Sequence, residues 1–136
     1  MEQKFVRILD TNLNRAKEGL RVIEDSARFV FNNEEIYKQL RTIRHKAASF
    51  LKYEYDQMLS SRDSITDVGR KAKEDTRADL KNIIIANFKR VEESFRVLEE
   101  YSKIINFETA LNYKELRYSI YQIEKNFVKL INEQKN

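Results

Sequence analysis

The sequence predicts an all-α protein, in which two sequence-related antiparallel helical hairpins form a four-helix bundle-like single domain with a long central connection. Three observations support this prediction. The chain of 136 residues contains no Pro and only 2 Gly, so it lacks the residues that the turns of a many-stranded β-protein require. Apolar residues recur every three or four positions through both halves. Hydrophobic residues make up 41% of the chain, which is enough for a packed core.

The first half, about residues 1–58, is expected to form one hairpin. Its first apolar stripe predicts a helix over about residues 4–31 and consists of Leu9, Leu13, Ala16, Leu20, Ile23, Ala27 and Val30. Asn32 followed by Glu35 is typical of a helix N-terminus. The stripe of the second helix consists of Ile36, Leu40, Ile43, Ala47 and Phe50. Glu54 interrupts this stripe before Met58 extends it, so the second helix is expected to end near residue 58.

Residues 59–75 lack this periodicity, and we expect them to form a functional loop, since connections longer than about 12 residues are uncommon in compact domains. The second half, about residues 76–136, repeats the hairpin. Thr76 and Asp79 match a capping box at its start. The third helical stripe consists of Leu80, Ile84, Phe88, Val91, Phe95, Leu98, Ser102 and Ile105. Asn106 is expected to cap the last helix, whose stripe consists of Tyr113, Leu116, Ile120, Ile123, Phe127 and Leu130.

The residues that the chain lacks exclude several classes of function. The absence of Cys excludes disulfides and thiolate nucleophiles, and the single His45 excludes the histidine pairs of di-iron bundles. The 2 Gly cannot supply a Gly-rich phosphate-binding motif, so side chains would have to hold any nucleotide. Because no apolar run approaches about 20 residues and the N-terminus is polar, we expect a cytoplasmic protein that does not enter a membrane.

The charge of the chain narrows its expected ligands. A net charge of +4 suits anionic ligands. Basic and acidic residues are interleaved along each predicted helix, so no continuous positive face is expected and nucleic acid is not an expected partner.

The two halves share polar residues that apolar periodicity alone cannot explain. At a shift of 75 residues, Asn12, Arg15, Glu18, Arg21, Val22 and Glu24 fall on Asn87, Arg90, Glu93, Arg96, Val97 and Glu99. At a shift of 76, YKQLR at 37–41 meets YKELR at 113–117. Two interpretations follow. Either a duplicated hairpin retains solvated charges, or both halves use the same polar set to build a site about a pseudo-twofold axis.

The outer face of the first helix is more apolar than a solvated face requires. Glu18 points away from the core on a helical wheel. The same face and its copy in the second half carry the apolar residues Val22, Phe29, Val97 and Ile104. We therefore expect either the long connection or a second subunit to cover this face, which makes a homodimer one expected arrangement. Covered Glu18 and Glu93 would need cationic or metal partners.

The combination of Arg, carboxylate and Asn side chains points to metal-assisted phosphoryl transfer. Arginines bind phosphate oxygens bidentately, carboxylates are the oxygen ligands that Mg²⁺ prefers, and asparagine can read the edge of a heterocycle. The connection adds four residues that could form a phosphate and Mg²⁺ loop, namely Arg62, Asp63, Asp67 and Gly69. Arg77 is a further candidate for a phosphate contact.

These polar residues occur in runs that together resemble a known family. The runs are Arg7 to Phe29, Leu40-Arg41 with Arg44-His45, Arg62-Asp63 with Asp67-Val68-Gly69, Ala86 to Arg90 with Glu93, Arg96 to Glu100, and Leu116-Arg117-Tyr118. They resemble the helical domain often found fused ahead of thiamine-phosphate synthase. The resemblance implies a hydroxymethylpyrimidine phosphate kinase of the non-ribokinase type, which converts the monophosphate to the diphosphate in thiamine biosynthesis. No barrel-sized segment follows residue 136, so the synthase is expected as a separate chain or a missing fusion half.

The chemistry of this reaction assigns roles to the candidate residues. The acceptor phosphate is already anionic and needs no strong base, so catalysis consists largely of neutralising charge. The arginines expected to act on phosphates are Arg15, Arg21, Arg62, Arg90 and Arg96. The carboxylates expected to bind Mg²⁺, the expected cofactor, are Glu18, Asp63, Asp67 and Glu93. The residues expected to bind the pyrimidine monophosphate or the co-substrate ATP are Asn12, Glu24, Arg44, His45, Gly69, Asn87 and Glu99.

Two other functions remain open from the sequence. The pairs Glu92-Glu93 and Glu99-Glu100, seven residues apart, suggest an all-helical Mg²⁺-dependent nucleotide pyrophosphohydrolase. Such an enzyme would release pyrophosphate from nucleoside triphosphates without an acceptor. A non-enzymatic helical interaction module, in which the repeated stripe is a partner surface, would bind neither ATP nor a pyrimidine phosphate.

Overall fold

A computed structural model describes residues 2–74 and 76–134 of the chain. Its helices are α1 (Glu2–Asp25), α2 (Glu34–Phe50), α3 (Tyr55–Ser60), α4 (Leu80–Ile105) and α5 (Phe107–Gln134), and one π-helical turn, η1 (Ser26–Val30), follows α1. No strand occurs among the described residues, so the all-α prediction is confirmed.

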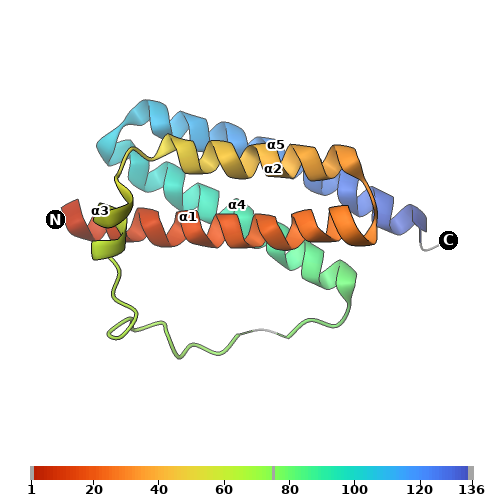
Figure 1. Cartoon of the computed structure of the whole chain (residues 1–136), viewed down its shortest axis with the longest axis horizontal. Coiled ribbons are helices and arrows are strands. Elements are labelled where there is room, and N and C mark those ends of the chain that lie inside the picture. The colour runs from red at the N-terminus through yellow and green to blue at the C-terminus, as the bar shows by residue number, and fades with distance from the viewer. Residues whose placement is uncertain (1, 75, 135–136) are drawn as a thin grey trace.

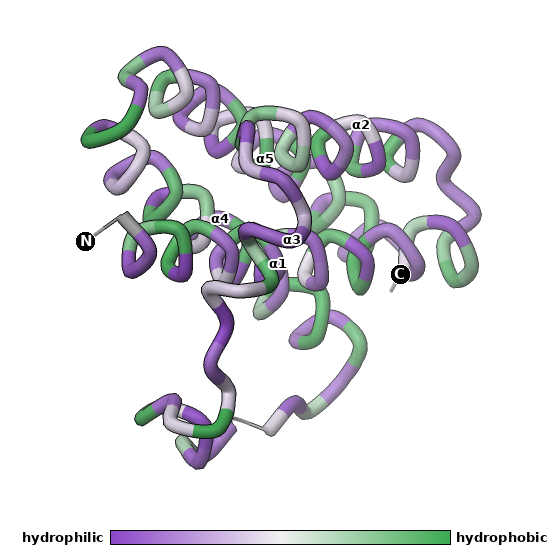
Figure 2. Tube along the Cα trace, turned by 60° about the vertical axis from the view of Figure 1, so that its left-hand side comes forward, coloured by the Kyte–Doolittle hydropathy of each residue, from purple (hydrophilic) through white to green (hydrophobic). Residues whose placement is uncertain are grey.

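The four long helices pack around a common core (Figure 1). α1 packs against both α2 and α4, and α5 packs against both α4 and α2. Figure 2 shows hydrophobic positions recurring along these helices. The apolar stripes predict the core well, because most of their members are buried. The exceptions, which are exposed or half-buried, are Val30, Phe50, Leu80, Ile105 and Leu130.

The turn of the first hairpin lies where the sequence predicts it, but its details differ. The predicted helix over about residues 4–31 is confirmed in extent, since the chain is helical from Glu2 to Val30, but its last turn widens into the π-helical η1 at Ser26 and Val30 is exposed. The chain then reverses at Asn32, whose φ of 51° lies in the left-handed region that Asn tolerates better than most residues. Asn33 caps α2 in place of the predicted Asn32, since its Oδ1 accepts a hydrogen bond from the backbone N of Ile36 at 2.9 Å.

Two further helix ends correct the predictions. α2 ends at Phe50 rather than near residue 58, because Leu51 is extended and the chain resumes as the short α3. Asp79 is itself the N-cap of α4 and accepts from the backbone N of Asn82 at 2.8 Å, so a capping box that begins at Thr76 is wrong. Asn106 caps α5 as predicted and accepts from the backbone N of Glu108 at 2.9 Å.

The central connection does not cover the outer face of α1. Its described residues from 62 onward are exposed, and Figures 1 and 2 both show the greater part of it running apart from the bundle. Phe29 and Ile104 remain 64% and 63% exposed, and Glu18 is exposed as well. The connection therefore does not supply the expected cover, and a second subunit on this face stays a prediction. None of the described helices is long and apolar enough to cross a membrane.

Candidate functional site

A polar cleft of about 420 Å³ lies between α1 and the start of the connection. The described residues that line it are Arg7, Asp10, Thr11, Asn14, Arg15, Glu18, Arg62, Asp63, Ser64 and Asp67. Five of the predicted site residues are among them, namely Arg15, Glu18, Arg62, Asp63 and Asp67. The fold thus brings together two polar motifs that are far apart in the sequence.

An ion pair between Asp10 and Arg62 holds the start of the connection against α1. The Nε and Nη2 atoms of Arg62 donate to the two carboxylate oxygens of Asp10 at 2.7 and 3.1 Å. Only 4% of the Asp10 side chain is exposed, and an unpaired carboxylate there would be costly. This hydrogen bonding also raises the pKa of Arg62. Because 42% of the Arg62 side chain is exposed, it can hold Asp10 and still face a ligand in the cleft.

Asp63 and Asp67 of the connection accept hydrogen bonds from neighbouring residues of the loop. The Nη2 of Arg7 donates to the backbone oxygen of Asp63 at 2.8 Å, which ties this part of the loop to α1. The Asp63 carboxylate accepts from both the hydroxyl and the backbone N of Thr66, and these hydrogen bonds lower its pKa. The Oδ1 of Asp67 accepts from the backbone N of Gly69 at 2.9 Å. Asp63 is therefore ionised at neutral pH, and the predicted ligand Gly69 contributes to the turn.

The described carboxylates do not form a ready-made metal site. No group of three Asp, Glu or His residues among them could hold a metal ion. Glu18, Asp63 and Asp67 line the polar cleft, whereas Glu93 is exposed on α4 and is not among the lining residues. Mg²⁺ usually binds proteins through one or two carboxylates together with water and substrate phosphates. Glu18, Asp63 and Asp67 are thus the predicted ligands that share one cleft, and Mg²⁺ binding by them stays a prediction.

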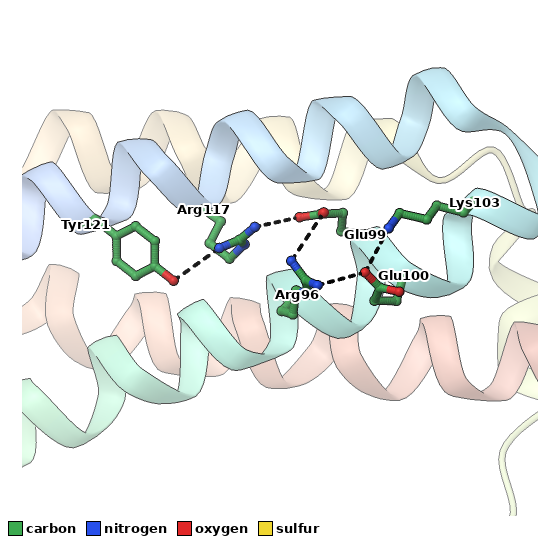
Figure 3. A network of polar contacts seen from close by, with 6 residues as sticks. All are labelled: Arg96, Glu99, Glu100, Lys103, Arg117 and Tyr121. Carbon is green, nitrogen blue, oxygen red and sulfur yellow. Dashed lines mark hydrogen bonds and ion pairs between the residues drawn. The ribbon is translucent and has the colours of Figure 1, made fainter.

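Three residues predicted to bind substrate form ion pairs between helices. Arg44 donates through Nε and Nη2 to Glu24 at 2.7 and 3.1 Å, and these hydrogen bonds raise the pKa of Arg44. Glu24 is fully buried. In the second half, Arg117 of α5 donates to Glu99 at 2.9 Å (Figure 3). These ion pairs join the helices within each hairpin, and substrate binding by Glu24, Arg44 and Glu99 stays a prediction.

A network of ion pairs extends the contact between Glu99 and Arg117 to the surface (Figure 3). Arg96 lies 3.6 Å from Glu99 and 3.1 Å from Glu100, and Lys103 lies 2.8 Å from Glu100. Arg117 also donates to the hydroxyl of Tyr121 at 3.2 Å, on the side away from Glu99. The predicted phosphate ligand Arg96 thus belongs to this network and does not line the polar cleft.

The remaining predicted residues lie outside the polar cleft. Asn12 and Asn87 each donate to the backbone oxygen four residues earlier, at 2.9 and 2.8 Å. The repeated asparagines therefore occupy equivalent local environments in α1 and α4. The other three are exposed on the helices, namely Arg21, His45 and Arg90. No residue of α4 lines the cleft, so it is built by the first half and the connection rather than about a pseudo-twofold axis.

Several cleft residues escaped the sequence analysis. They are Arg7, Asp10, Thr11, Asn14 and Ser64. One available signal was the mismatch between the halves, since Asp10 falls on Ile85 at the shift of 75 residues. A carboxylate where the other repeat has an apolar residue marks a position with a separate role. Asn14, whose Nδ2 donates to Asp10 at 3.2 Å, could be found only from the fold.

The glutamate pairs that suggested a pyrophosphohydrolase do not form a common site. Glu92 is buried between Lys89 and Glu124, and the burial raises its pKa to about 7. Glu93 and Glu100 are exposed, while Glu99 binds Arg117. Among the described residues, these carboxylates belong to no group that could hold a metal ion.

Comparison with known proteins places the chain in a family. The sequence model of the ThiD2 family matches residues 7–126. Proteins named thiamine-phosphate synthase are similar to the chain: that of Nostoc punctiforme is 40% identical over 131 residues, which cover 94% of the chain and 36% of the relative. That of Rhodopirellula baltica is 42% identical over 120 residues, covering 85% and 32%. The chain thus spans about a third of the length of these curated relatives. No solved structure matches it significantly. The chain belongs to the ThiD2 family.

Proposed function

We propose that the chain transfers the γ-phosphoryl group of ATP to hydroxymethylpyrimidine phosphate and forms the diphosphate. The polar cleft carries this proposal, because it gathers arginines and carboxylates from α1 and from the connection. The wider context of thiamine biosynthesis is supported by the family and by relatives named thiamine-phosphate synthase. Such a synthase, as a separate chain or as the other part of a fusion, is the proposed partner.

The residues of the cleft suit this reaction. An oxygen of the acceptor phosphate attacks the γ-phosphorus of ATP, and the bond to the bridging oxygen breaks so that ADP leaves. Arg15 and Arg62 can neutralise the two phosphate groups, whose mutual repulsion is the main obstacle. Glu18 and Asp67 can bind Mg²⁺ that enters with ATP, where it offsets phosphate charge. No histidine or other strong base is needed, since the acceptor is ionised at neutral pH.

The test is ATP-dependent formation of the diphosphate by the Arg15→Ala variant. We expect the rate to fall about 100-fold, as is typical when one group that stabilises transition-state charge is removed. Circular dichroism should remain helical, because Arg15 is exposed and does not contribute to the core. Lys114→Ala is the matched control, since Lys114 is an exposed cation on α5 outside the cleft. The free alcohol of the pyrimidine serves as the acceptor control and should give no product.

Other outcomes would favour the alternatives. Equal rates in the Arg15→Ala and Lys114→Ala variants would reject the cleft as the site. Release of pyrophosphate from ATP without an acceptor would favour the pyrophosphohydrolase. Calorimetry that detects binding of neither ATP nor the pyrimidine monophosphate would favour the interaction module. Sedimentation at a mass near 16.3 kDa would count against the proposed homodimer.

A further inference from the structure

A second, smaller cavity lies where α2 ends and the chain turns towards α3. We call it the end pocket. It has a volume of about 210 Å³ and is lined by Leu9, Phe50, Leu51, Lys52, Tyr53, Ser102, Ile105, Asn106 and Thr109. None of these residues lines the polar cleft, although Leu9 and Asp10 are neighbours in α1. One turn of α1 therefore contributes to both cavities.

The end pocket lies where the two halves differ in structure, because α2 ends at Phe50 and the corresponding part of α5 continues. At the shift of 76 residues, 51–54 correspond to 127–130, which lie inside the continuous α5. Phe127 is fully buried and packs edge-on against both Phe31 and Phe88. The equivalent Leu51 is only half-buried and extended, because α2 has ended. Phe127 therefore fills a space in the second hairpin that Leu51 does not fill in the same way in the first.

Ser102, which lines the end pocket, has an unsatisfied hydroxyl. The residue is 2% exposed, and its buried hydroxyl has no hydrogen-bond partner among the described residues. A buried serine in a helix commonly donates its hydroxyl to the backbone oxygen four residues earlier, as Ser26 does to Val22 at 3.2 Å. Ser102 does not form such a hydrogen bond. The equivalent of Ser102 in the first half is the fully buried Ala27, so packing between the helices does not require a hydroxyl. An unpaired buried hydroxyl is costly and calls for a partner.

We propose that the end pocket binds a single uncharged heteroaromatic ring that forms a hydrogen bond with Ser102. A dry apolar cavity of about 150 Å³ holds benzene in another protein, so 210 Å³ can hold a six-membered ring with small substituents. Leu9, Phe50 and Ile105 provide apolar walls, as ligand pockets generally require. Among the residues that line the pocket, the charged one is the exposed Lys52, so the buried part of the pocket suits an uncharged ring.

The inference deepens the proposed function, on which its choice of ligand rests, because the pyrimidine of the acceptor is such a ring. It can be tested without phosphoryl transfer by using the free hydroxymethylpyrimidine alcohol as the probe. Calorimetry with the whole chain should detect one molecule bound per chain. Ser102→Ala removes the hydroxyl and should weaken binding about three- to tenfold, the effect of one neutral hydrogen bond.

A pair of neighbouring variants separates the pocket from general effects on the helix. Ile105→Trp places an indole at the pocket, where it should abolish binding of the alcohol. Ile104→Trp is the control, because Ile104 is 63% exposed and does not line the pocket. Lys114→Ala should leave binding of the alcohol unchanged, since Lys114 is exposed on α5 and does not line the pocket. Thermal unfolding of each variant verifies that it is folded.

The outcomes keep this inference apart from the kinase proposal. If the wild-type chain does not bind the alcohol, or if Ile105→Trp binds it as well as Ile104→Trp does, the end pocket is not the ring site. If the alcohol binds and Ile105→Trp alone loses it, the end pocket is the ring site, even where no diphosphate forms from ATP. Diphosphate formation at equal rates in both tryptophan variants would support the kinase and overturn the pocket.

Discussion

The two hairpins of the bundle share a buried ion pair between their helices but differ at the positions that line the cavities. Each has a buried glutamate held by an arginine of the partner helix, Glu24 by Arg44 and Glu99 by Arg117. These arginines are not equivalent in the repeat, because Arg41 is the residue that aligns with Arg117, and it is exposed. The comparison shows that the repeated carboxylates form buried ion pairs with arginines from different repeat positions. The cavities arise where the halves differ, at positions such as Asp10 against Ile85.

The largest effect should come from breaking the buried ion pairs. Glu24→Ala leaves Arg44, whose side chain is 11% exposed, without its partner, and such a loss typically costs about 3–5 kcal/mol. Glu99→Ala should cost less, about 2 kcal/mol, because Arg117 keeps its hydrogen bond to Tyr121. Urea unfolding at neutral pH measures both free energies.

An exposed carboxylate provides the control for this comparison. Glu100→Ala should cost less than about 1 kcal/mol, since Glu100 forms surface ion pairs with Arg96 and Lys103. Equal losses from Glu24→Ala and Glu99→Ala would mean that the two hairpins hold their carboxylates equally strongly.

A pH-dependent difference between the halves should come next in size. Glu92, which falls on Lys17 of the first half, has its pKa raised to about 7 by burial and by Glu124, although Lys89 opposes the shift. Between the ordinary value of 4.5 and about 7, the folded chain keeps a proton that the unfolded chain releases. Stability should therefore be full below pH 4.5, as far as this group contributes, and fall by about 2–3 kcal/mol as pH rises to 7.

The Glu92→Gln variant isolates this contribution. It keeps the shape of the side chain but cannot ionise. The free energy of unfolding of this variant should therefore not decrease between pH 5 and 7.5 as that of the wild-type chain does. A wild-type chain whose stability does not fall in this range would contradict the raised pKa of Glu92.

The core could be predicted from the sequence because the buried residues of a helix recur with its periodicity. The apolar stripe of each helix therefore marks its buried face. Leu20 and Phe95, for example, are buried where their stripes put them. The helix ends were harder, because the π-helical turn at Ser26 and the extended Leu51 depend on local backbone geometry that no periodicity encodes. Roles of charged residues were hardest. The sequence gives Glu18 and Glu24 the same polarity, but the fold exposes one and buries the other against Arg44.

A smaller loss than that from the Glu24 ion pair is expected at the contact between α1 and α4. A Cβ at Gly19 would lie 2.8 Å from Cγ2 of Val91 and 3.3 Å from the backbone oxygen of Asn87. Gly19→Ala should therefore destabilise the chain by about 1–2 kcal/mol, since overpacking outweighs the gain of about 1 kcal/mol in helix propensity. Thermal unfolding measures the change.

The repeat again supplies the matched control. Ser94 aligns with Gly19 and is also buried, but it already carries a Cβ that the packing accommodates. Ser94→Ala should change stability by less than about 1 kcal/mol. If Gly19→Ala is as stable as the wild-type chain, close approach of the helices is not the reason for glycine at this position.

The exposed connection has a consequence for how the two hairpins stay together. Beyond its hydrogen bonds to Asp10 and Arg7 at one end, the covalent link crosses solvent, while α1 meets α4 and α2 meets α5 across the shared core. A protease that cut between residues 70 and 74 would leave two fragments whose association depends on apolar packing rather than on the peptide chain. The nicked protein should therefore migrate as one particle under native conditions and separate only when denatured.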